Sequence, residues 1–157
     1  MPDMLVKLYN LPDSNCIIEE LKNNSIELRH PLPPEKNIVI NWVKNNFGEG
    51  WSCEFEKTFS NLPVSSYIAI KDEKILGFAC YEATCKNFFG PTGVLESARG
   101  IGIGAALFLK CLESLKGQGY AYAVVGGAGP TEFYRKVAGA TIIEDSYPGI
   151  YKGILKY

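Results

Sequence analysis

Histidine is almost absent from this chain, and no two of its cysteines form a Cys-x-x-Cys pair. Among 157 residues there are one histidine, His30, and five cysteines. Zinc sites are built from closely spaced Cys and His ligands, so the sequence predicts no metal centre. An odd number of cysteines does not indicate a disulfide framework either. We interpret the cysteines as small apolar residues of a protein from a reducing compartment.

The chain also lacks an excess of charge of one sign and any long hydrophobic run. Its net charge is −1, which argues against non-specific binding to nucleic acid. No apolar stretch approaches the roughly 20 residues of a membrane-spanning helix, and no secretory signal precedes the first elements. We therefore expect a cytoplasmic protein. With 46% hydrophobic residues, the sequence predicts one domain over residues 1–157, with residues 1–25 as an N-terminal extension.

Glycine, by contrast, is concentrated in one informative place. The segment Arg99–Ala105 reads Arg-Gly-Ile-Gly-Ile-Gly-Ala and lies between an apolar stretch and a helix pattern that extends to Leu115. Three alternate glycines at a strand-to-helix turn leave backbone N–H groups exposed at a helix N-terminus. Unpaired N–H groups and the helix dipole both favour negative charge, so the loop predicts a phosphate or pyrophosphate site.

Three interpretations of this loop compete. Gly100-x-Gly102-x-x-Ala105 fits a dinucleotide fingerprint, which also requires an acidic residue at the end of the next strand. The next apolar run, residues 120–125, is followed by two glycines and has no acid, which counts against a nucleotide-binding oxidoreductase. A P-loop fails because no Gly-Lys-Ser/Thr follows. The third pattern is Arg99-x-x-Gly102-x-Gly104.

This third pattern resembles the pyrophosphate loop of the GCN5-related N-acetyltransferase (GNAT) family. A second segment, Gly129–Ala140, is similar to the family's late helix, with Phe133 and Tyr134 ahead of a terminal glycine. The specific match covers residues 64–144, and Glu96 stands where the family often has proline. The resemblance implies a mixed α/β fold of the acyl-CoA N-acyltransferase type. Its central, mostly antiparallel sheet has a bulged strand and is flanked by helices.

Hydrophobic periodicity agrees with such a fold. A period of two predicts strands over residues 67–70, 75–82 and 88–95, the last interrupted by Gly90-Pro91, which indicates a bulge. A helical period predicts helices over residues 15–23, 34–47, 51–59, 104–115 and 130–139. Further strands are expected over residues 4–9, 26–29, 120–125, 141–144 and 150–155.

The resemblance implies acetyl-CoA as acyl donor, without a metal. The residues that it places at the cofactor are Val94, Leu95, Arg99, Gly100, Ile101, Gly102, Ile103, Gly104, Ala105 and Phe133. It further implies that a backbone N–H near Val94 or Leu95 polarises the thioester carbonyl. Tyr134 takes the position of the family's general acid, which protonates the departing thiolate.

The general base is less clearly marked. Many family members have a glutamate on the central strand, but residues 88–94 contain none. Glu82, on the preceding strand, is the nearest carboxylate. Burial in its apolar run is expected to raise its pKa into a useful range, although a solvated position at the strand end fits the sequence equally well. Glu96 and a chain of water molecules are the alternatives, while Cys80 and Cys85 are interpreted as core residues.

The leading hypothesis is direct transfer of an acetyl group from acetyl-CoA to a primary amine of a small molecule or peptide. A CoA-binding sensor without turnover stays open, because the strand acid is missing. The acceptor-side candidates, none assigned, are Phe47, Trp51, Glu54, Tyr147 and Tyr151. The segment after Tyr147 either closes the sheet or pairs with a second subunit, so monomer and homodimer both remain open.

Overall fold

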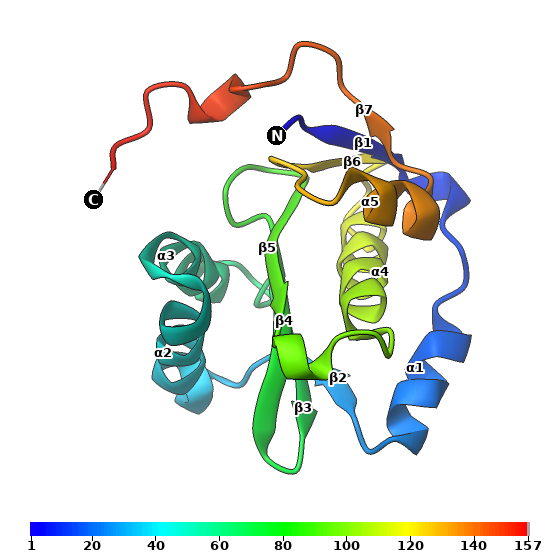
Figure 1. Cartoon of the computed structure of the whole chain (residues 1–157), viewed down its shortest axis with the longest axis vertical. Helices are drawn as coiled ribbons and strands as arrows, with labels where there is room; N and C mark the ends of the chain where they lie inside the picture. Colours follow the sequence, from blue (N-terminus) through cyan, green and yellow to red (C-terminus); the bar gives the residue numbers. More distant parts are fainter. Residues whose placement is uncertain (157) are drawn as a thin grey trace.

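The computed structural model describes residues 1–156, and at its centre is a seven-stranded mixed sheet (Figure 1). The strands are β1 (Met4–Lys7), β2 (Glu27–Arg29), β3 (Ser66–Lys71), β4 (Lys74–Tyr81), β5 (Phe88–Val94), β6 (Tyr122–Val125) and β7 (Thr141–Ile142). Their order in the sheet is β2-β3-β4-β5-β6-β1-β7. Every neighbouring pair is antiparallel except β5 and β6, which are parallel. The mostly antiparallel sheet expected from the sequence is confirmed.

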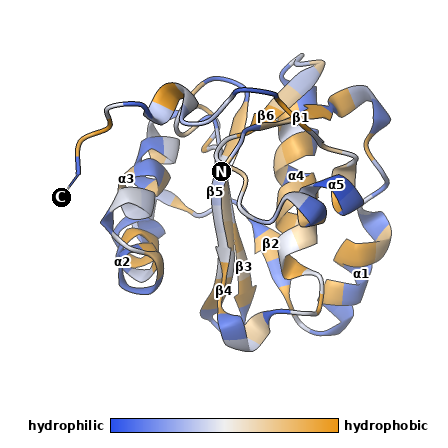
Figure 2. Cartoon of the chain, turned by 45° about the horizontal axis from the view of Figure 1, so that its top comes forward, coloured by the Kyte–Doolittle hydropathy of each residue, from blue (hydrophilic) through white to orange (hydrophobic). Residues whose placement is uncertain are grey.

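Helices cover both faces of this sheet. They are α1 (Asn15–Asn23), α2 (Lys36–Phe47), α3 (Glu49–Lys57), α4 (Ile103–Gly117) and α5 (Thr131–Ala138). Figures 1 and 2 show α2 and α3 on one face and α1, α4 and α5 on the other. Gly48, at φ +102°, separates α2 from α3. Gly50 lies inside α3, which begins at Glu49 rather than at Trp51 as predicted. None of the helices in residues 1–156 combines the length and the apolar composition of a membrane-spanning segment.

Because helices lie on both faces, the sheet has a core on each side. Helix α4 forms the centre of the larger core, where its apolar face is fully buried. That face consists of Phe108, Cys111, Leu112 and Leu115. Burial of one such large side chain is worth about 1.5–3 kcal/mol. The smaller core beneath α2 and α3 consists of Val39, Val43, Phe55, Ile68, Phe78, Cys80 and Ala83.

The amino-terminal strand is an interior part of the sheet. Met4 pairs with Val125 of β6 on one side and with Ile142 of β7 on the other. Met4 and Val6 are fully buried in the larger core. The first residues of the chain, expected to form an extension, therefore complete the half of the sheet that contains β6.

The prediction of a second closing strand over residues 150–155 is wrong. After β7 the chain forms only a short 3-10 turn, Gly149–Tyr151, and no strand follows in residues 152–156. Pro148 precedes this turn, and Gly149 and Gly153 have φ of +58° and +76°. Such left-handed residues interrupt the extended backbone that a strand requires. Residues 145–156, here called the C-terminal strap, instead arch over the end of the sheet towards α3 (Figure 1). The edge strand that was predicted as a possible pairing site for a second subunit is absent from residues 143–156.

Candidate functional site

The candidate site is built around a gap between β5 and β6. The two strands pair only through residues 88–89 of β5 and residues 124–125 of β6. Gly90 and Pro91 follow, joined by a cis peptide bond, and Gly90 has a φ of +117°. Beyond them β5 continues beside β4 without a partner on its β6 side. The interruption predicted at Gly90-Pro91 is therefore the point where the sheet opens.

A bulge in β5 accompanies the opening. Tyr81 of β4 pairs with Phe89, whereas Ala79, two residues away, pairs with Thr92, three residues along β5. One extra residue in β5 thus shifts the alternation of the strand. Because backbone groups point to alternate edges of a strand, a one-residue shift exchanges the groups that face β4 with those that face β6.

This shift decides which backbone donors face the gap. Leu95 donates its N–H to the carbonyl oxygen of Leu76 in the β4 edge, at 2.9 Å. The N–H groups of Val94 and Thr92, one and three residues before Leu95, point to the opposite edge and into the gap. Of the two donors that the sequence offered for the thioester carbonyl, Leu95 is engaged with β4 and Val94 faces the gap.

The glycine-rich loop leads from β5 into α4 and ends in an uncapped helix N-terminus. Gly100 and Gly102 have φ of +89° and +96°, conformations that residues with a side chain rarely adopt. A β-carbon on Gly102 would also lie 2.9 Å from Cδ1 of Ile17. No side chain caps α4, so its first-turn N–H groups, residues 103–105, have no partner within the helix. They form a concentrated set of donors for an anion.

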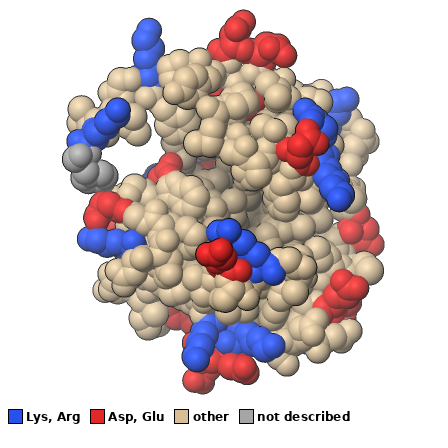
Figure 3. All heavy atoms as spheres, in the orientation of Figure 1, with Lys and Arg blue, Asp and Glu red and all other residues tan. Residues whose placement is uncertain are grey.

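A cavity of about 1100 Å³ joins this helix N-terminus to the gap. The space-filling view shows a hollow near the middle of the face seen in Figure 1, bordered mainly by uncharged side chains (Figure 3). The residues that the resemblance assigned to the cofactor and that line the cavity are Val94, Arg99, Gly100, Gly102, Ile103, Gly104, Ala105 and Phe133. Ile101 is 51% exposed and does not line it, and Leu95 lines a separate cavity.

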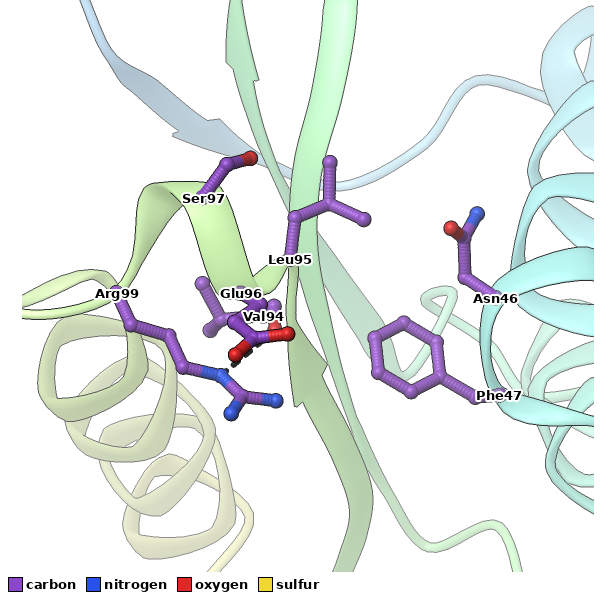
Figure 4. Close-up of a pocket in the computed structure, with 7 residues that line it drawn as sticks. All are labelled: Asn46, Phe47, Val94, Leu95, Glu96, Ser97 and Arg99. Atoms are coloured by element: carbon purple, nitrogen blue, oxygen red, sulfur yellow. Dashed lines mark hydrogen bonds between the residues drawn. The ribbon is translucent and has the colours of Figure 1, made fainter.

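Arg99 stands between these two cavities. Its Nε donates to the carbonyl oxygen of Val94 at 3.2 Å, which ties the side chain to the end of β5. The second cavity, of about 670 Å³, is lined by Arg99 and the end of β5 together with Asn46 and Phe47 of α2. Figure 4 shows Arg99 on one side of this cavity and the two α2 residues on the other. A fixed guanidinium thus lies beside the anion site of α4.

Tyr134 reaches the main cavity from α5. Its ring packs edge-on against Phe108, with centroids 5.0 Å apart, and against Phe89. The side chain is 6% exposed, and burial raises the pKa of its hydroxyl to about 12. Tyr134 is one of the residues that line the cavity. At neutral pH the phenol is fully protonated and available as a proton donor.

The opposite end of the cavity is formed by α3, the β4–β5 turn and the C-terminal strap. The residues that line this end are Trp51, Glu54, Thr84, Tyr147 and Tyr151. Four of the five acceptor-side candidates from the sequence are therefore brought together, while Phe47 lines the second cavity. Thr84 was missed, because nothing in its local sequence distinguishes it. Its hydroxyl donates to Oε1 of Glu54 at 2.5 Å.

A hydrogen bond ties the strap to Asp3, the residue before β1, and Asp3 in turn binds the residues that follow β6. The N–H of Asp3 donates to Oγ of Ser146 at 2.8 Å, and the N–H of Gly127 donates to Oδ1 of Asp3 at 2.8 Å. The Tyr151 hydroxyl lies so close to β6 that a β-carbon on Gly126 would be 2.9 Å from it. The strap thus forms a wall of the cavity.

Glu82 lies outside the cavity, and its environment differs from the expectation. Burial alone would raise its pKa, but hydrogen bonds from Tyr120, Lys86 and the backbone N–H of Asn87 outweigh that effect and lower the pKa. Lys86 Nζ is 3.0 Å and Asn87 N is 3.1 Å from the carboxylate. The expected upward pKa shift is wrong. Glu82 stabilises the turn between β4 and β5, away from the gap.

No group of three or more His, Cys, Asp or Glu residues within residues 1–156 is arranged to hold a metal ion. The residues that line the cavity offer backbone donors, one guanidinium, one carboxylate, and tyrosine and threonine hydroxyls. Such a set is suited to holding a phosphate-bearing ligand at one end and an electropositive group at the other.

Comparison with known proteins identifies similar chains. A family model described as the acetyltransferase (GNAT) family matches residues 36–140, more than half of the chain. A search of curated protein sequences gave no match. Several solved structures also match. Three of them are each less than 25% identical to this chain, so they establish similarity of fold.

The first of these structures is a GCN5-related glucosamine N-acetyltransferase region in a fungal multi-domain GH3 beta-N-acetylglucosaminidase. It is 15% identical with a TM-score of 0.73, and the match covers 90% of this chain and 19% of that one. A GCN5-related N-acetyltransferase from Sphaerobacter thermophilus is 18% identical with a TM-score of 0.70, over 90% of this chain and 48% of that one. The chain thus spans less than half of either protein.

A GNAT family acetyltransferase from Brucella melitensis, solved in complex with acetyl-CoA, is closer in length. It is 22% identical with a TM-score of 0.50, and the match covers 71% of this chain and 80% of that one.

Proposed function

The chain belongs to the GNAT acetyltransferase family, and we propose that it transfers an acetyl group from acetyl-CoA directly to a primary amine. One observation carries the proposal. A single cavity contains the N-terminus of α4, the donor edge of β5 beyond the bulge and the protonated hydroxyl of Tyr134. The reaction needs these three elements at one site: an anion holder, a carbonyl polariser and an acid.

The pyrophosphate of CoA is held at the start of α4. The N–H groups of residues 103–105 and the helix dipole supply hydrogen bonds and positive potential, and Arg99 adds a fixed charge. Space at this point supports the assignment. A β-carbon on Gly104 would lie 3.8 Å from both Phe133 and Val94, in the space that a ligand between them would occupy.

The thioester lies along β5 in the gap. The N–H groups of Thr92 and Val94 point into the opening, where one of them donates to the carbonyl oxygen. Donors that are already aligned with developing negative charge stabilise the transition state, and loss of one such donor in other enzymes costs about 2.7–4 kcal/mol. The bulge at Gly90-Pro91 is what turns these donors towards the ligand.

Tyr134 protonates the departing thiolate of CoA. Because its pKa is about 12, its hydroxyl carries a proton across the whole physiological range. Tyr134 lines the cavity, and the aromatic contacts to Phe108 and Phe89 fix its ring. A rigid donor of this kind contributes on the order of 10²–10⁴-fold to the rate.

Thermal unfolding with separate additions of acetyl-CoA, CoA and NADPH tests the proposal. A ligand present at 100 times its dissociation constant adds about 2.7 kcal/mol to the free energy of unfolding. We expect a clear rise of the melting temperature with both forms of CoA and none with NADPH. A rise with NADPH alone would identify a nucleotide-binding oxidoreductase, and no rise with either CoA form would contradict the proposal.

Thiol release from acetyl-CoA, measured against a library of primary amines, tests turnover. At least one amine should accelerate release in proportion to enzyme concentration. If CoA binds and no amine is acetylated, the chain is a CoA-binding sensor.

A further inference from the structure

The cavity has one carboxylate, and it lies on the face of the sheet opposite the phosphate site. Two charged side chains line the cavity, Arg99 beside α4 and Glu54 on α3. Figure 1 shows α3 and α4 on opposite faces of the sheet, with the opening of β5 and β6 between them. A ligand that enters from the α3 face therefore meets Glu54 before it reaches the thioester in the gap.

Glu54 differs from the other glutamates of α3. Glu49 pairs with Lys44 at 2.7 Å and Glu56 pairs with Lys36 at 3.3 Å, both in exposed positions. Glu54 is half-buried and forms no ion pair within residues 1–156. A half-buried carboxylate without a counter-charge favours a cationic ligand.

The carboxylate is oriented. Oε1 of Glu54 accepts a hydrogen bond from the Thr84 hydroxyl at 2.5 Å, which leaves the other oxygen for a further donor. The hydroxyl of Tyr151 also interacts with Thr84. Burial raises the pKa of Tyr151, the Glu54 charge raises it further, and its hydrogen bond to Thr84 acts in the opposite direction. Tyr151 is thus neutral and the buried Cys80 thiol, near Glu54, is neutral as well.

Aromatic side chains line the same cavity as this carboxylate. Trp51 lies one turn earlier on α3 and stacks on Phe47, with ring centroids 5.6 Å apart. Tyr147 and Tyr151 of the strap form the other wall. Trp51 and Tyr147 are 39% and 71% exposed, so each ring keeps some surface for a ligand. Aromatic faces attract cations and also bury apolar groups.

We propose that Glu54 binds the ammonium group of the acceptor and then removes its proton, and that the acceptor is a cationic amine with a flat apolar group. This inference rests on the proposed acetyl transfer. The ammonium binds between the carboxylate and the aromatic walls, and its apolar group lies between Trp51 and Tyr147. Thr84 is a positioning residue, because it acts by holding Glu54.

The proposed acetyl transfer moves two protons from the acceptor nitrogen. The ammonium group gives one proton to Glu54, and the neutral amine nitrogen attacks the thioester carbonyl carbon. The new C–N bond forms and the C–S bond breaks. The departing thiolate takes the Tyr134 proton, which is replaced by the second proton lost from nitrogen. Glu54 releases its proton to water, so the products are an amide, CoA as the free thiol and one proton.

Fluorescence titration tests the ammonium site without acetyl-CoA. The probes are benzylammonium and benzyl alcohol, which share a shape and differ in charge. The chain has two tryptophans, so a Trp42→Phe background makes Trp51 the sole reporter. We expect benzylammonium to bind at least tenfold more tightly than benzyl alcohol, a preference that Glu54→Gln removes and the matched control Glu56→Gln retains.

Equal affinity for the two probes, no binding of benzylammonium, or an unchanged preference in Glu54→Gln would each overturn the ammonium site. Circular dichroism melts of the variants verify that they are folded. Glutamine keeps the size of Glu54 and can still accept the Thr84 hydrogen bond.

Steady-state acetylation of benzylamine tests the base role. At neutral pH we expect Glu54→Gln to lower kcat/KM by about 10²–10⁴-fold. The deficit should shrink as pH rises towards the pKa of the amine, since solution then supplies the neutral form. A deficit that does not change with pH, or unchanged kcat/KM, overturns the base role. Binding through Glu54 without turnover by any form would instead contradict the proposed acetyl transfer and leave the ammonium site standing.

Discussion

Phe47 lies directly on the backbone of Gly93. A β-carbon built on Gly93 would be 2.6 Å from Cε1 and 2.7 Å from Cζ of the Phe47 ring. Phe47 also stacks on Trp51 and packs against Phe78, with ring centroids 5.6 Å and 5.5 Å apart. The end of α2 therefore packs against β5, next to the Thr92 and Val94 N–H groups that face the gap.

This contact predicts the effect of Gly93→Ala. The added methyl must displace a ring that two neighbours hold in place, so we expect a loss of about 1–3 kcal/mol in the free energy of unfolding, measured by urea denaturation. The control is Gly50→Ala in α3, where a β-carbon meets nothing within 4 Å. That change should leave stability unchanged or raise it by up to about 1 kcal/mol. Equal stability of the two variants would contradict the contact.

Gly104→Ala should separate CoA binding from folding. Gly104 is in the first turn of α4 and a β-carbon there makes only ordinary contacts, at 3.8 Å, so the fold should tolerate alanine. The methyl would occupy ligand space between Phe133 and Val94, and we expect the affinity for CoA to fall at least tenfold, which is about 1.4 kcal/mol. Isothermal titration calorimetry measures the affinity. Gly117→Ala, at the other end of the same helix, should bind CoA like the parent chain.

Tyr134→Phe should reduce turnover and spare CoA binding. The variant removes one hydroxyl from a ring whose packing it retains, so kcat should fall by about 10²–10⁴-fold. Because the pKa of Tyr134 is about 12, the hydroxyl is protonated at all pH values near neutrality, and the deficit should be constant between about pH 6 and 9. Tyr122→Phe, an exposed tyrosine on β6, is the control. A Tyr134→Phe enzyme with parental kcat would remove Tyr134 from the mechanism.

The ion pair of Arg29 and Glu35 predicts a pH-dependent contribution to stability. The guanidinium donates to both carboxylate oxygens, at 2.8 and 2.6 Å, and the Leu32 N–H adds a third hydrogen bond. Together they lower the pKa of Glu35 to about 2. A lowered folded-state pKa stabilises the fold above the unfolded value near 4.5, and the contribution is lost as pH falls towards 2. The pair is partly exposed and screened, so we expect Glu35→Gln to cost about 1 kcal/mol at pH 7.

Chemical denaturation at pH 7 and at pH 2.5 measures this difference. The difference in the free energy of unfolding between Glu35→Gln and the parent chain should become smaller at the lower pH. If this difference in unfolding free energy is as large at pH 2.5 as at pH 7, the effect arises from packing and not from the ion pair. Glu56→Gln, which breaks the exposed pair with Lys36, should change stability little at either pH.

The features that the sequence predicted well are local ones. Helix α4, the glycine-rich loop and the interruption at Gly90-Pro91 are each specified by residues that are near one another in the chain. Periodicity and the special conformations of glycine and proline act over a few residues, so they can be recognised without knowledge of the fold.

The features that the sequence did not predict depend on distant partners. The pKa of Glu82 is lowered in part by Tyr120, which is far along the chain and reaches it only in the folded sheet. Thr84 acquires a role only because α3 brings Glu54 beside it. The strap was mistaken for a strand because apolar residues recur in it, whereas Pro148 and the left-handed glycines after it determine its path.

The place of β1 in the sheet also sets the order in which the molecule can fold. β1 is the first strand of the chain, yet both of its partners, β6 and β7, lie more than a hundred residues further on. The β2-β3-β4-β5 side is joined mainly by short connections, whereas closing β1 between β6 and β7 requires a loop of that length to form, and contacts so distant in sequence slow folding. During synthesis, β1 must therefore wait until residues 122–142 have left the ribosome. The cavity then comes into existence late, when the half of the sheet with β6 and α5 docks onto the half with β5.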